Sequence, residues 1–372
     1  MGRKPKICFL GMENLPVLAP GFETHRVGGE QVQQSLLAKA FVRWGYDVSM
    51  VTGDYGQLDG QTWEGVKVFK SYGAREGLPV IRFVYPRWVK TWMALRRADA
   101  DVYYTSCAGM QVGLLAMFCQ RHKRRFVFRI ASDRDCDPQR LLIRLRRDRW
   151  LYEYGLRRAD VVLAQSEQQT EALRSNFGMA SVIAGMLVDN PDGYRTFAER
   201  DIDVLWVNNL QTFKRPDLLL DLALRMPEAS FHMIGGPNDP RLYEQIKRQA
   251  QTIPNLDFHG PVPYRQVGEY YDRCRVFVNT SDFEGFPNSY LQAWVRGVPV
   301  VAFFDMDGLI EKEGLGRSAV SMSVMTESVR RLLTDTSAWS QTGTRCRDFM
   351  AKHYSESHIL QPYMDAFGRL TE

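Results

Sequence analysis

The sequence predicts an α/β protein built from two Rossmann-like domains. Short apolar runs rich in Val, Ile and aromatic residues alternate with longer amphipathic runs, which is typical of βαβ units around parallel sheets. A polar stretch at 189–200, which includes Pro191 and Gly193, interrupts this alternation. A second series of βαβ units starts at Asp203, and the length of 372 residues allows two or three domains.

The first half of the chain opens with a strand and a helix. Apolar residues at helical spacing, such as Val32, Leu36 and Phe41, define the helix, and Gly45 ends it. A turn-rich excursion with β character follows it. We expect strands at 6–11, 48–52, 101–104, 126–130 and 160–166, the excursion at 55–75, and helices at 30–44, 109–119, 139–158 and 167–177.

The expected helix at 139–158 is rich in arginine, and its apolar residues should face the core. These apolar residues are Leu141, Leu142, Leu145, Leu151, Tyr152 and Leu156. The arginines invite a nucleic-acid interpretation, but no recognition motif accompanies them. We therefore expect no nucleic-acid partner.

Apolar and basic residues alternate between Pro79 and Arg97, where Trp88 and Met93 stand near Arg87. A helix of this composition can lie on an anionic membrane surface. A core helix with a solvated basic face has the same composition. The sequence leaves both interpretations open.

The second half continues the alternation of strands and helices, with Gly and Pro between them. We expect strands at 203–207, 231–236, 256–262, 276–279 and 297–303, and helices at 217–225, 241–251, 265–271, 290–296, 327–333 and 346–370.

The composition is that of an ordinary globular protein, with 45% hydrophobic and 24% charged residues. No run of 18 apolar residues predicts a transmembrane helix, and the apolar run at Ile7 is too short for a signal peptide. Six cysteines without a C-x-x-C pair predict reduced core thiols in a cytoplasmic protein, and six scattered histidines predict no metal site. Residues 1–195 carry a net charge of +9 and residues 196–372 one of −4, so the basic half should face an anionic partner.

The loop between the last two apolar runs carries the clearest chemistry. Gly285 and Pro287 break the strand, and Asn288 or Ser289 is expected to cap the helix that follows. The N–H groups at a helix start, together with the helix dipole, attract anions such as phosphate.

Glu284 lies just before this helix start, and its carboxylate cannot itself hold a phosphate. It can accept hydrogen bonds from hydroxyl groups beside the phosphate, and a phosphate beside hydroxyls describes a nucleotide sugar. Asn288 and Gln292 are four residues apart on the helix, so they can reach the same ligand.

This loop resembles the Glu-x7-Glu signature of the retaining glycosyltransferases of family 4. Glu284 matches the first Glu, which in the family holds hydroxyls of the donor sugar. Gln292 stands at the second position, which binds the ribose, and an amide lacks the charge-assisted part of that hydrogen bond. The family holds the donor diphosphate with the loop and helix start between them, which here are Gly285, Phe286, Pro287, Asn288, Ser289 and Tyr290.

The resemblance extends along the expected second domain. Family members contact the diphosphate with an Arg and with a Lys five residues later. Asn209 stands in the Arg place and Lys214 in the Lys place, and Arg215 could supply the missing charge. Gly235, in a glycine turn, and Val262, in a loop that resembles the nucleobase pocket, complete the expected donor site.

The first domain resembles the family more loosely. Gly28 and Gly29 match a loop that lies across from the donor and lines the acceptor side. Many members have a His after the strand at 126–130 that contacts the transferred sugar. This chain has none there, and Asp133 or Arg134 is expected to fill part of that role.

The resemblance implies the GT-B fold, in which two Rossmann-like domains face each other across a deep cleft and a C-terminal helix returns to the first domain. The expected parts are an acceptor-side domain at 1–193, a nucleotide-sugar domain at 194–350 and the returning helix at 351–372.

The implied activity is that of a retaining hexosyl- or N-acetylhexosaminyl-transferase, with Glu284, Lys214 and Asp133 as catalytic residues. It would move a sugar from a UDP- or GDP-sugar to a glycan or lipid-linked acceptor in polysaccharide or glycolipid biosynthesis. We expect no metal or other cofactor, because no DxD-like loop is evident and Lys214 with helix N–H groups can balance the diphosphate. The expected location is the cytoplasm, at the inner face of an anionic membrane.

Two alternatives stay open. Gln292 and the missing His also fit a non-catalytic nucleotide-sugar-binding partner of another transferase. A GT-B epimerase would need a cluster of acids and histidines in the first domain, and the sequence offers none.

Overall fold

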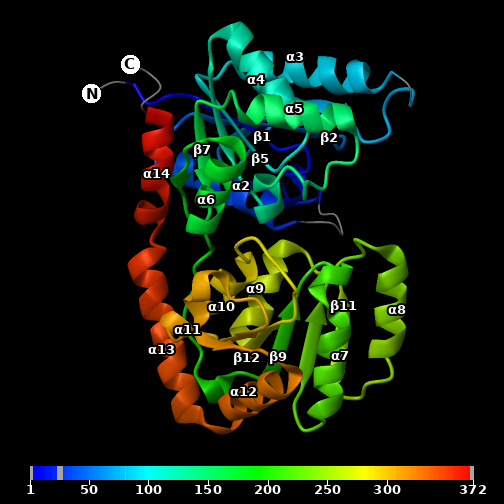
Figure 1. Ribbon diagram of the computed structural model, residues 1–372, viewed down its shortest axis with the longest axis vertical. Helices are drawn as coiled ribbons and strands as arrows, with labels where there is room; N and C mark the ends of the chain where they lie inside the picture. Colours follow the sequence, from blue (N-terminus) through cyan, green and yellow to red (C-terminus); the bar gives the residue numbers. More distant parts are fainter. Residues whose placement is uncertain (1–2, 23–27, 80, 369–372) are drawn as a thin grey trace. The chain divides into compact units, whose positions relative to one another are not determined.

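The computed structural model describes residues 3–22, 28–79 and 81–368, and its chain divides into two compact units (Figure 1). The described parts of 1–23, 29–187 and 356–372 form the first unit, and 188–355 form the second together with Gly28. The expected boundaries at 193 and 350 compare with divisions after Leu187 and after Ser355.

The first unit contains an eight-stranded sheet in the order β3-β4-β2-β1-β5-β6-β7-β8. All neighbouring strands pair in parallel except β3 and β4, which form an antiparallel pair within the expected excursion. Its strands are β1 Ile7–Leu10, β2 Val48–Asp54, β3 Thr62–Trp63, β4 Val66–Gly73, β5 Val102–Ser106, β6 Arg125–Arg129, β7 Val161–Ala164 and β8 Val182–Ile183.

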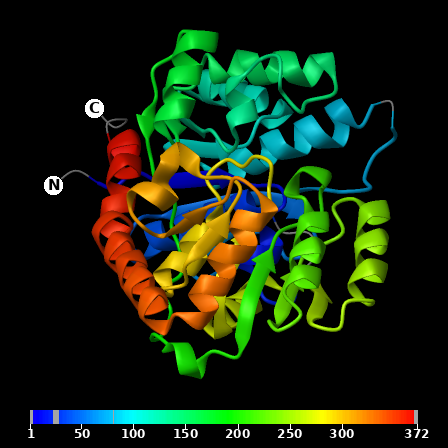
Figure 2. The same cartoon turned by 60° about the horizontal axis from the view of Figure 1, so that its bottom comes forward.

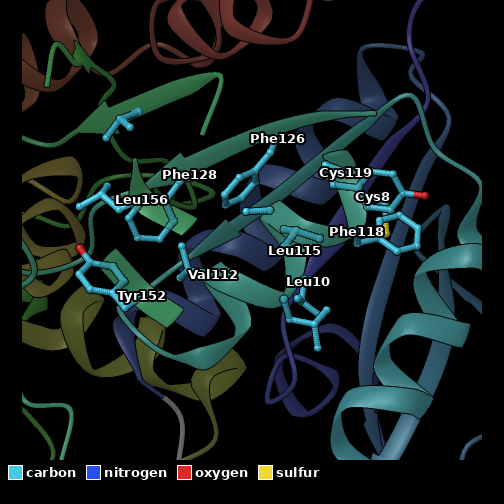
Figure 3. Close-up of a cluster of buried hydrophobic side chains, with 14 of the residues drawn as sticks. Cys8, Leu10, Val112, Leu115, Phe118, Cys119, Phe126, Phe128, Tyr152 and Leu156 are labelled. Carbon is cyan, nitrogen blue, oxygen red and sulfur yellow. The ribbon is translucent and has the colours of Figure 1, made fainter. Parts of the chain in front are cut away.

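Helices cover both faces of this sheet because successive strand residues point to opposite sides. On one face, Cys8, Leu10 and Phe128 pack with side chains of α3, α4 and α5 in a continuous apolar core (Figure 3). On the other face, Tyr104 of β5 meets Tyr363 and Phe367 of the last helix. The helices are α1 Leu15–Leu18, α2 Gly29–Arg43, η1 Phe83–Trp88, α3 Val89–Ala98, α4 Met110–His122, η2 Asp133–Cys136, α5 Arg146–Leu156, α6 Glu167–Phe177 and α14 Glu356–Gly368.

The second unit contains a six-stranded parallel sheet in the order β11-β10-β9-β12-β13-β14. Its strands are β9 Ile202–Val207, β10 Phe231–Ile234, β11 Leu256–Gly260, β12 Cys274–Asn279, β13 Val300–Ala302 and β14 Gly316–Ser318. Each unit is therefore an α/β unit with a largely parallel sheet, as the sequence predicted.

The second sheet also lies between two helix layers, as Figure 2 shows. Val276 and Val278 of β12 pack with α7, α8 and α12, whereas Phe277 between them meets Tyr271 of α9 and Tyr290 of α10. The helices are η3 Phe197–Glu199, η4 Thr212–Lys214, α7 Pro216–Arg225, α8 Pro240–Ala250, α9 Tyr264–Arg273, α10 Asn288–Val295, η5 Met306–Gly308, α11 Leu309–Lys312, α12 Met322–Thr334 and α13 Thr336–His353.

The prediction of one helix over 139–158 was wrong in its first part, because α5 begins only at Arg146. Leu141 and Ile143 pack against the core, but Leu142 between them is 70% exposed. That alternation has the period of two of an extended chain, not the period of a helix. Leu145, also expected in the core, is exposed as well.

Candidate functional site

Lys214 and Glu284 form the centre of the candidate site in the second unit. Lys214 ends the short helix η4 after β9, and Glu284 lies in the loop after β12. Since β9 and β12 are parallel neighbours, the loops at their carboxyl ends meet at one edge of the sheet. The Lys214 Nζ and a Glu284 carboxylate oxygen form an ion pair there, with both side chains largely buried.

Glu284 is held by two further polar side chains that sequence reasoning did not single out. Ser281 Oγ donates to Glu284 Oε1 at 2.7 Å, and Asn279 Nδ2 lies 3.3 Å from the same oxygen. Asn279 Oδ1 in turn accepts a bond from the backbone N–H of Ser281. The carboxylate is thus fixed in direction before any ligand arrives.

The backbone around Lys214 is fixed in the same way. Thr280 Oγ1 donates to the Lys214 carbonyl at 2.8 Å and accepts from Trp206 Nε1 at 2.9 Å. The rings of Phe213 and Phe283 stack with centroids 4.6 Å apart, which ties the two loops together beside the ion pair. The polar run after the buried part of β12 was the available signal for these supporting residues.

The helix after this loop begins differently from the prediction. Asn288 is the first residue of α10, Pro287 precedes it as the N-cap residue, and no side chain caps the helix. Proline suits that position because it has no N–H to satisfy. The expected cap by Asn288 or Ser289 was therefore wrong, although the helix start itself lies where the sequence predicted it.

Other residues of the expected diphosphate loop have mixed surroundings. Tyr290 is buried and its hydroxyl donates to the Phe304 carbonyl, while its backbone N–H bonds the Pro287 carbonyl. Burial, and then the charge of Glu284, raise the pKa of the Tyr290 hydroxyl. Gly285 is half-buried, and the Phe286 ring lies 6.1 Å from Tyr354.

Gln292 is engaged at both ends of its amide. Its Nε2 donates to the Tyr264 hydroxyl at 3.0 Å, and its Oε1 accepts from Arg296 at 2.9 Å. Tyr264 donates onward to Asp189, and Arg296 pairs with Asp272. One N–H and one lone pair of the amide remain for a ribose, so this network sets the amide orientation.

Arg215 does not carry a spare positive charge as expected. It pairs with Asp217 at 2.8 Å and with Asp282 at 3.4 Å. The hydrogen bond to Asp217 is the main reason why the pKa of Arg215 is raised. Asn209, in the expected Arg place, is half-buried in the loop after β9.

Gly235 allows two loops at the sheet edge to approach closely. A Cβ at this position would lie 2.3 Å from the Asn208 carbonyl oxygen, so only glycine fits without a backbone shift. Val262 follows β11 and is half-buried.

The expected residues of the first unit lie around the amino end of α2 and after β6. Gly28 precedes α2 and Gly29 is its first residue. Asp133 opens the short helix η2 and accepts a hydrogen bond from Gln169 of α6 at 2.9 Å.

A buried ion pair in the first unit was not predicted. Arg129, at the end of β6, is 1% exposed and lies 3.1 Å from Glu30 in the first turn of α2. Ser106, at the end of β5, also bonds the Glu30 carboxylate and accepts from Gln34. Burial raises the pKa of Glu30, while Arg129 and Ser106 oppose that shift. Glu30 and Arg129 are 99 residues apart, so no local pattern marks the pair.

Two negative findings concern the described residues, 3–22, 28–79 and 81–368. No three His, Cys, Asp or Glu side chains among them gather closely enough to hold a metal ion. None of their helices has the length and apolar character needed to cross a bilayer.

The fold is that of the GT-B glycosyltransferases, as comparison with solved structures shows. Sucrose-phosphate synthase from Thermosynechococcus elongatus superposes with a TM-score of 0.77 at 16% identity, over 99% of both chains. TarM of S. aureus, in complex with fondaparinux, α-GlcNAc-glycerol and UDP, gives a TM-score of 0.72 at 13% identity, over 98% of this chain and 99% of that one.

The sequence comparisons agree with the fold. Residues 28–184 match a model described as glycosyl transferase 4-like domain, and residues 201–335 match one described as glycosyl transferases group 1. The O-antigen biosynthesis glycosyltransferase WbnH of Escherichia coli is 36% identical over 115 residues, 30% of this chain. That match spans only 32% of the relative's length. These findings support a glycosyltransferase of the family 4 and group 1 type in glycan biosynthesis.

Proposed function

We propose that the chain is a retaining hexosyl- or N-acetylhexosaminyl-transferase that uses a UDP- or GDP-sugar. The acceptor is a glycan or a lipid-linked glycan, in polysaccharide or glycolipid biosynthesis. The contact between Lys214 and Glu284, 70 residues apart in the chain, carries this proposal. A cation beside a carboxylate suits the two halves of a nucleotide sugar, because the cation attracts phosphate and the carboxylate accepts from hydroxyls.

The proposed reaction breaks the bond between C1 of the donor sugar and the β-phosphate oxygen, and the electron pair stays on the phosphate. Lys214 and the N–H groups at the start of α10 stabilise that charge. The acceptor hydroxyl oxygen forms the new bond to C1, and its proton passes to the departing phosphate. Glu284 holds donor hydroxyls, and Asp133 contacts the transferred sugar.

The bound diphosphate competes with Glu284 for the Lys214 ammonium in this proposal. Ser281 and Asn279 keep hold of the carboxylate during that exchange, so Glu284 stays directed at the sugar. We also propose a cytoplasmic location, which the six free cysteines support.

Calorimetry with UDP, GDP and ADP tests donor binding, and slow hydrolysis of their sugars without acceptor tests chemistry. Lys214→Met should weaken nucleoside diphosphate binding by about 10- to 100-fold, because a hydrogen bond to a charged group is lost. Glu284→Gln should keep diphosphate binding and lose turnover. Lys39→Met is the matched control, since Lys39 pairs with Glu64 and its side chain is also 15% exposed.

Three outcomes decide between the candidates. Binding of no nucleotide by the wild-type chain refutes the donor site. Tight binding without hydrolysis or transfer favours the non-catalytic partner. Equal losses in Lys214→Met and Lys39→Met would mean that Lys214 acts only through the fold.

A further inference from the structure

Large apolar side chains are exposed on two segments of the first unit. The segment around η1 and α3 exposes Leu78, Ile81, Val84, Tyr85, Val89 and Met93. The segment that leads into α5 exposes Leu142, Leu145 and Trp150. Val84 and Trp150 are 58% and 57% exposed. Clustered exposure of this kind marks an interaction surface, whereas scattered single residues do not.

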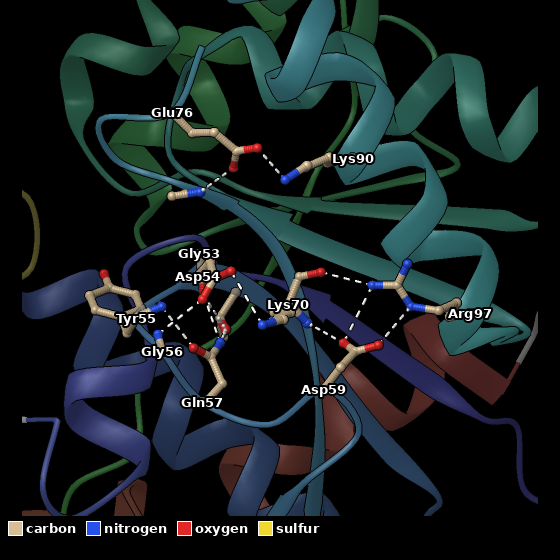
Figure 4. A network of polar contacts seen from close by, with 12 residues as sticks. Gly53, Asp54, Tyr55, Gly56, Gln57, Asp59, Lys70, Glu76, Lys90 and Arg97 are labelled. Carbon is tan, nitrogen blue, oxygen red and sulfur yellow. Dashed lines mark hydrogen bonds and ion pairs between the residues drawn. The ribbon is translucent and has the colours of Figure 1, made fainter.

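Helix α3 is oriented by ion pairs on its inner side (Figure 4). Lys90 pairs with Glu76, and Arg97 pairs with Asp59 at 3.0 Å and donates to the Lys70 carbonyl. The opposite side of the helix, with Val89, Met93 and Arg96 at spacings of four and three, therefore faces solvent.

The two segments form one surface because they touch. The Arg147 guanidinium lies 3.4 Å above the Phe83 ring, and Phe83 packs beside Trp88. Trp88, Leu141 and Ile143 pack against the core beneath. We call the exposed residues of the two segments the basic–apolar surface.

This surface is strongly cationic. Residues 75–97 contain six Lys or Arg and one Glu, and residues 137–150 contain five Arg and two Asp. Among the described residues, no ion pair involves Arg82, Arg96, Arg140, Arg144 or Arg146. Arginine can extend from apolar surroundings toward a charged layer, so the two kinds of side chain serve one partner.

We propose that the basic–apolar surface docks on an anionic lipid bilayer. Exposed aromatic and aliphatic side chains enter the headgroup region, and the unpaired arginines contact lipid phosphates. Charge complementarity with anionic lipid favours a bilayer over a second copy of this surface, since two copies would bring like charges together. The inference does not rest on sugar transfer, so a failed vesicle test with intact donor binding would leave the proposed function unchanged.

Vesicle flotation tests the docking, with vesicles of phosphatidylcholine alone or with about one third phosphatidylglycerol. The full chain should float with the anionic vesicles at low salt, less so at high salt, and little with the neutral ones. The variant R82E/R144E/R146E should lose at least about tenfold in partition coefficient. The control R241E/K247E/R248E makes the same charge change on exposed residues of α8 and should retain binding.

A second variant tests the apolar part. I81S/V84S/M93S changes only exposed side chains, so the fold should survive and vesicle binding should fall at every salt concentration. Quenching by brominated lipid should also decrease in Trp150→Phe. Three results would overturn the proposal: no flotation of the wild type, equal losses in both charge variants, or a dimer that I81S/V84S/M93S dissociates while vesicle binding persists.

Discussion

The ion pair between Lys214 and Glu284 should stabilise the second unit as well as serve the proposed chemistry. The two side chains are 15% and 9% exposed, between the surface and the fully buried limit. Exposed pairs contribute about 0.2–1 kcal/mol, whereas loss of one partner from a buried pair costs about 3–5 kcal/mol. We therefore expect Lys214→Met to lower the free energy of unfolding by about 2 kcal/mol.

A double-mutant cycle isolates the pair from other effects of each substitution. Glu284→Gln keeps an oxygen that accepts from Ser281 and Asn279, so it should cost less than Lys214→Met. The double variant should be more stable than additivity predicts, with a coupling energy of about 1–2 kcal/mol. That sign follows because each single variant leaves one partner unmatched.

Peptide-level hydrogen exchange is the suitable assay, because a single unfolding curve cannot separate two units. Peptides from β9 and β12 report the second unit, and peptides from β5 and β6 are the internal reference. The pair Lys39 and Glu64 in the first unit provides a matched cycle, in which Glu64 is 45% exposed. Its coupling should stay below about 1 kcal/mol. A coupling below about 0.5 kcal/mol for Lys214 and Glu284 would refute the reasoning.

Three further predictions concern other buried groups. Burial raises the pKa of Asp135 to about 7, so its stabilising contribution is full below pH 4 and is lost as pH rises to 7. Relative to Asp135→Asn, the wild type should lose up to about 1.4 kcal/mol per pH unit in that window, and parallel pH profiles in urea would contradict this. Arg129→Met should cost about 3–5 kcal/mol in thermal unfolding, because it leaves the Glu30 carboxylate buried without its cation. Adding Glu30→Gln should recover much of that loss, and no recovery would contradict the pairing. Gly235→Ala should destabilise the chain by about 1–3 kcal/mol through its backbone clash. Gly193→Ala, with open space around it, is the control and should leave the melting temperature unchanged.

Local patterns were sufficient to predict the element order and the two central side chains. Strand signals placed Lys214 and Glu284 after β9 and β12, and parallel strands bring their following loops to one edge. The βαβ pattern thus predicted the contact without any knowledge of side-chain partners.

Interactions between distant residues were beyond local patterns. Arg215 looked like a spare cation because Asp282, which partly neutralises it, is 67 residues away. Gln292 looked available because Tyr264 lies on another helix, 28 residues earlier. Leu142 and Leu145 read as helical core residues because a run of leucines and arginines fits both periods, and only packing selects the extended chain.

Helix α14 has a consequence for synthesis of the chain. Its Phe367 lies 5.1 Å from Phe41 and its Tyr363 hydroxyl bonds the Gly185 carbonyl, so the first unit includes the last residues translated. A ribosome adds about 5–20 residues per second, so residues 188–355 take on the order of ten to thirty seconds to emerge. During that interval Phe41 and Tyr104 await their cover, and nascent chains would be open to chaperone capture at that face.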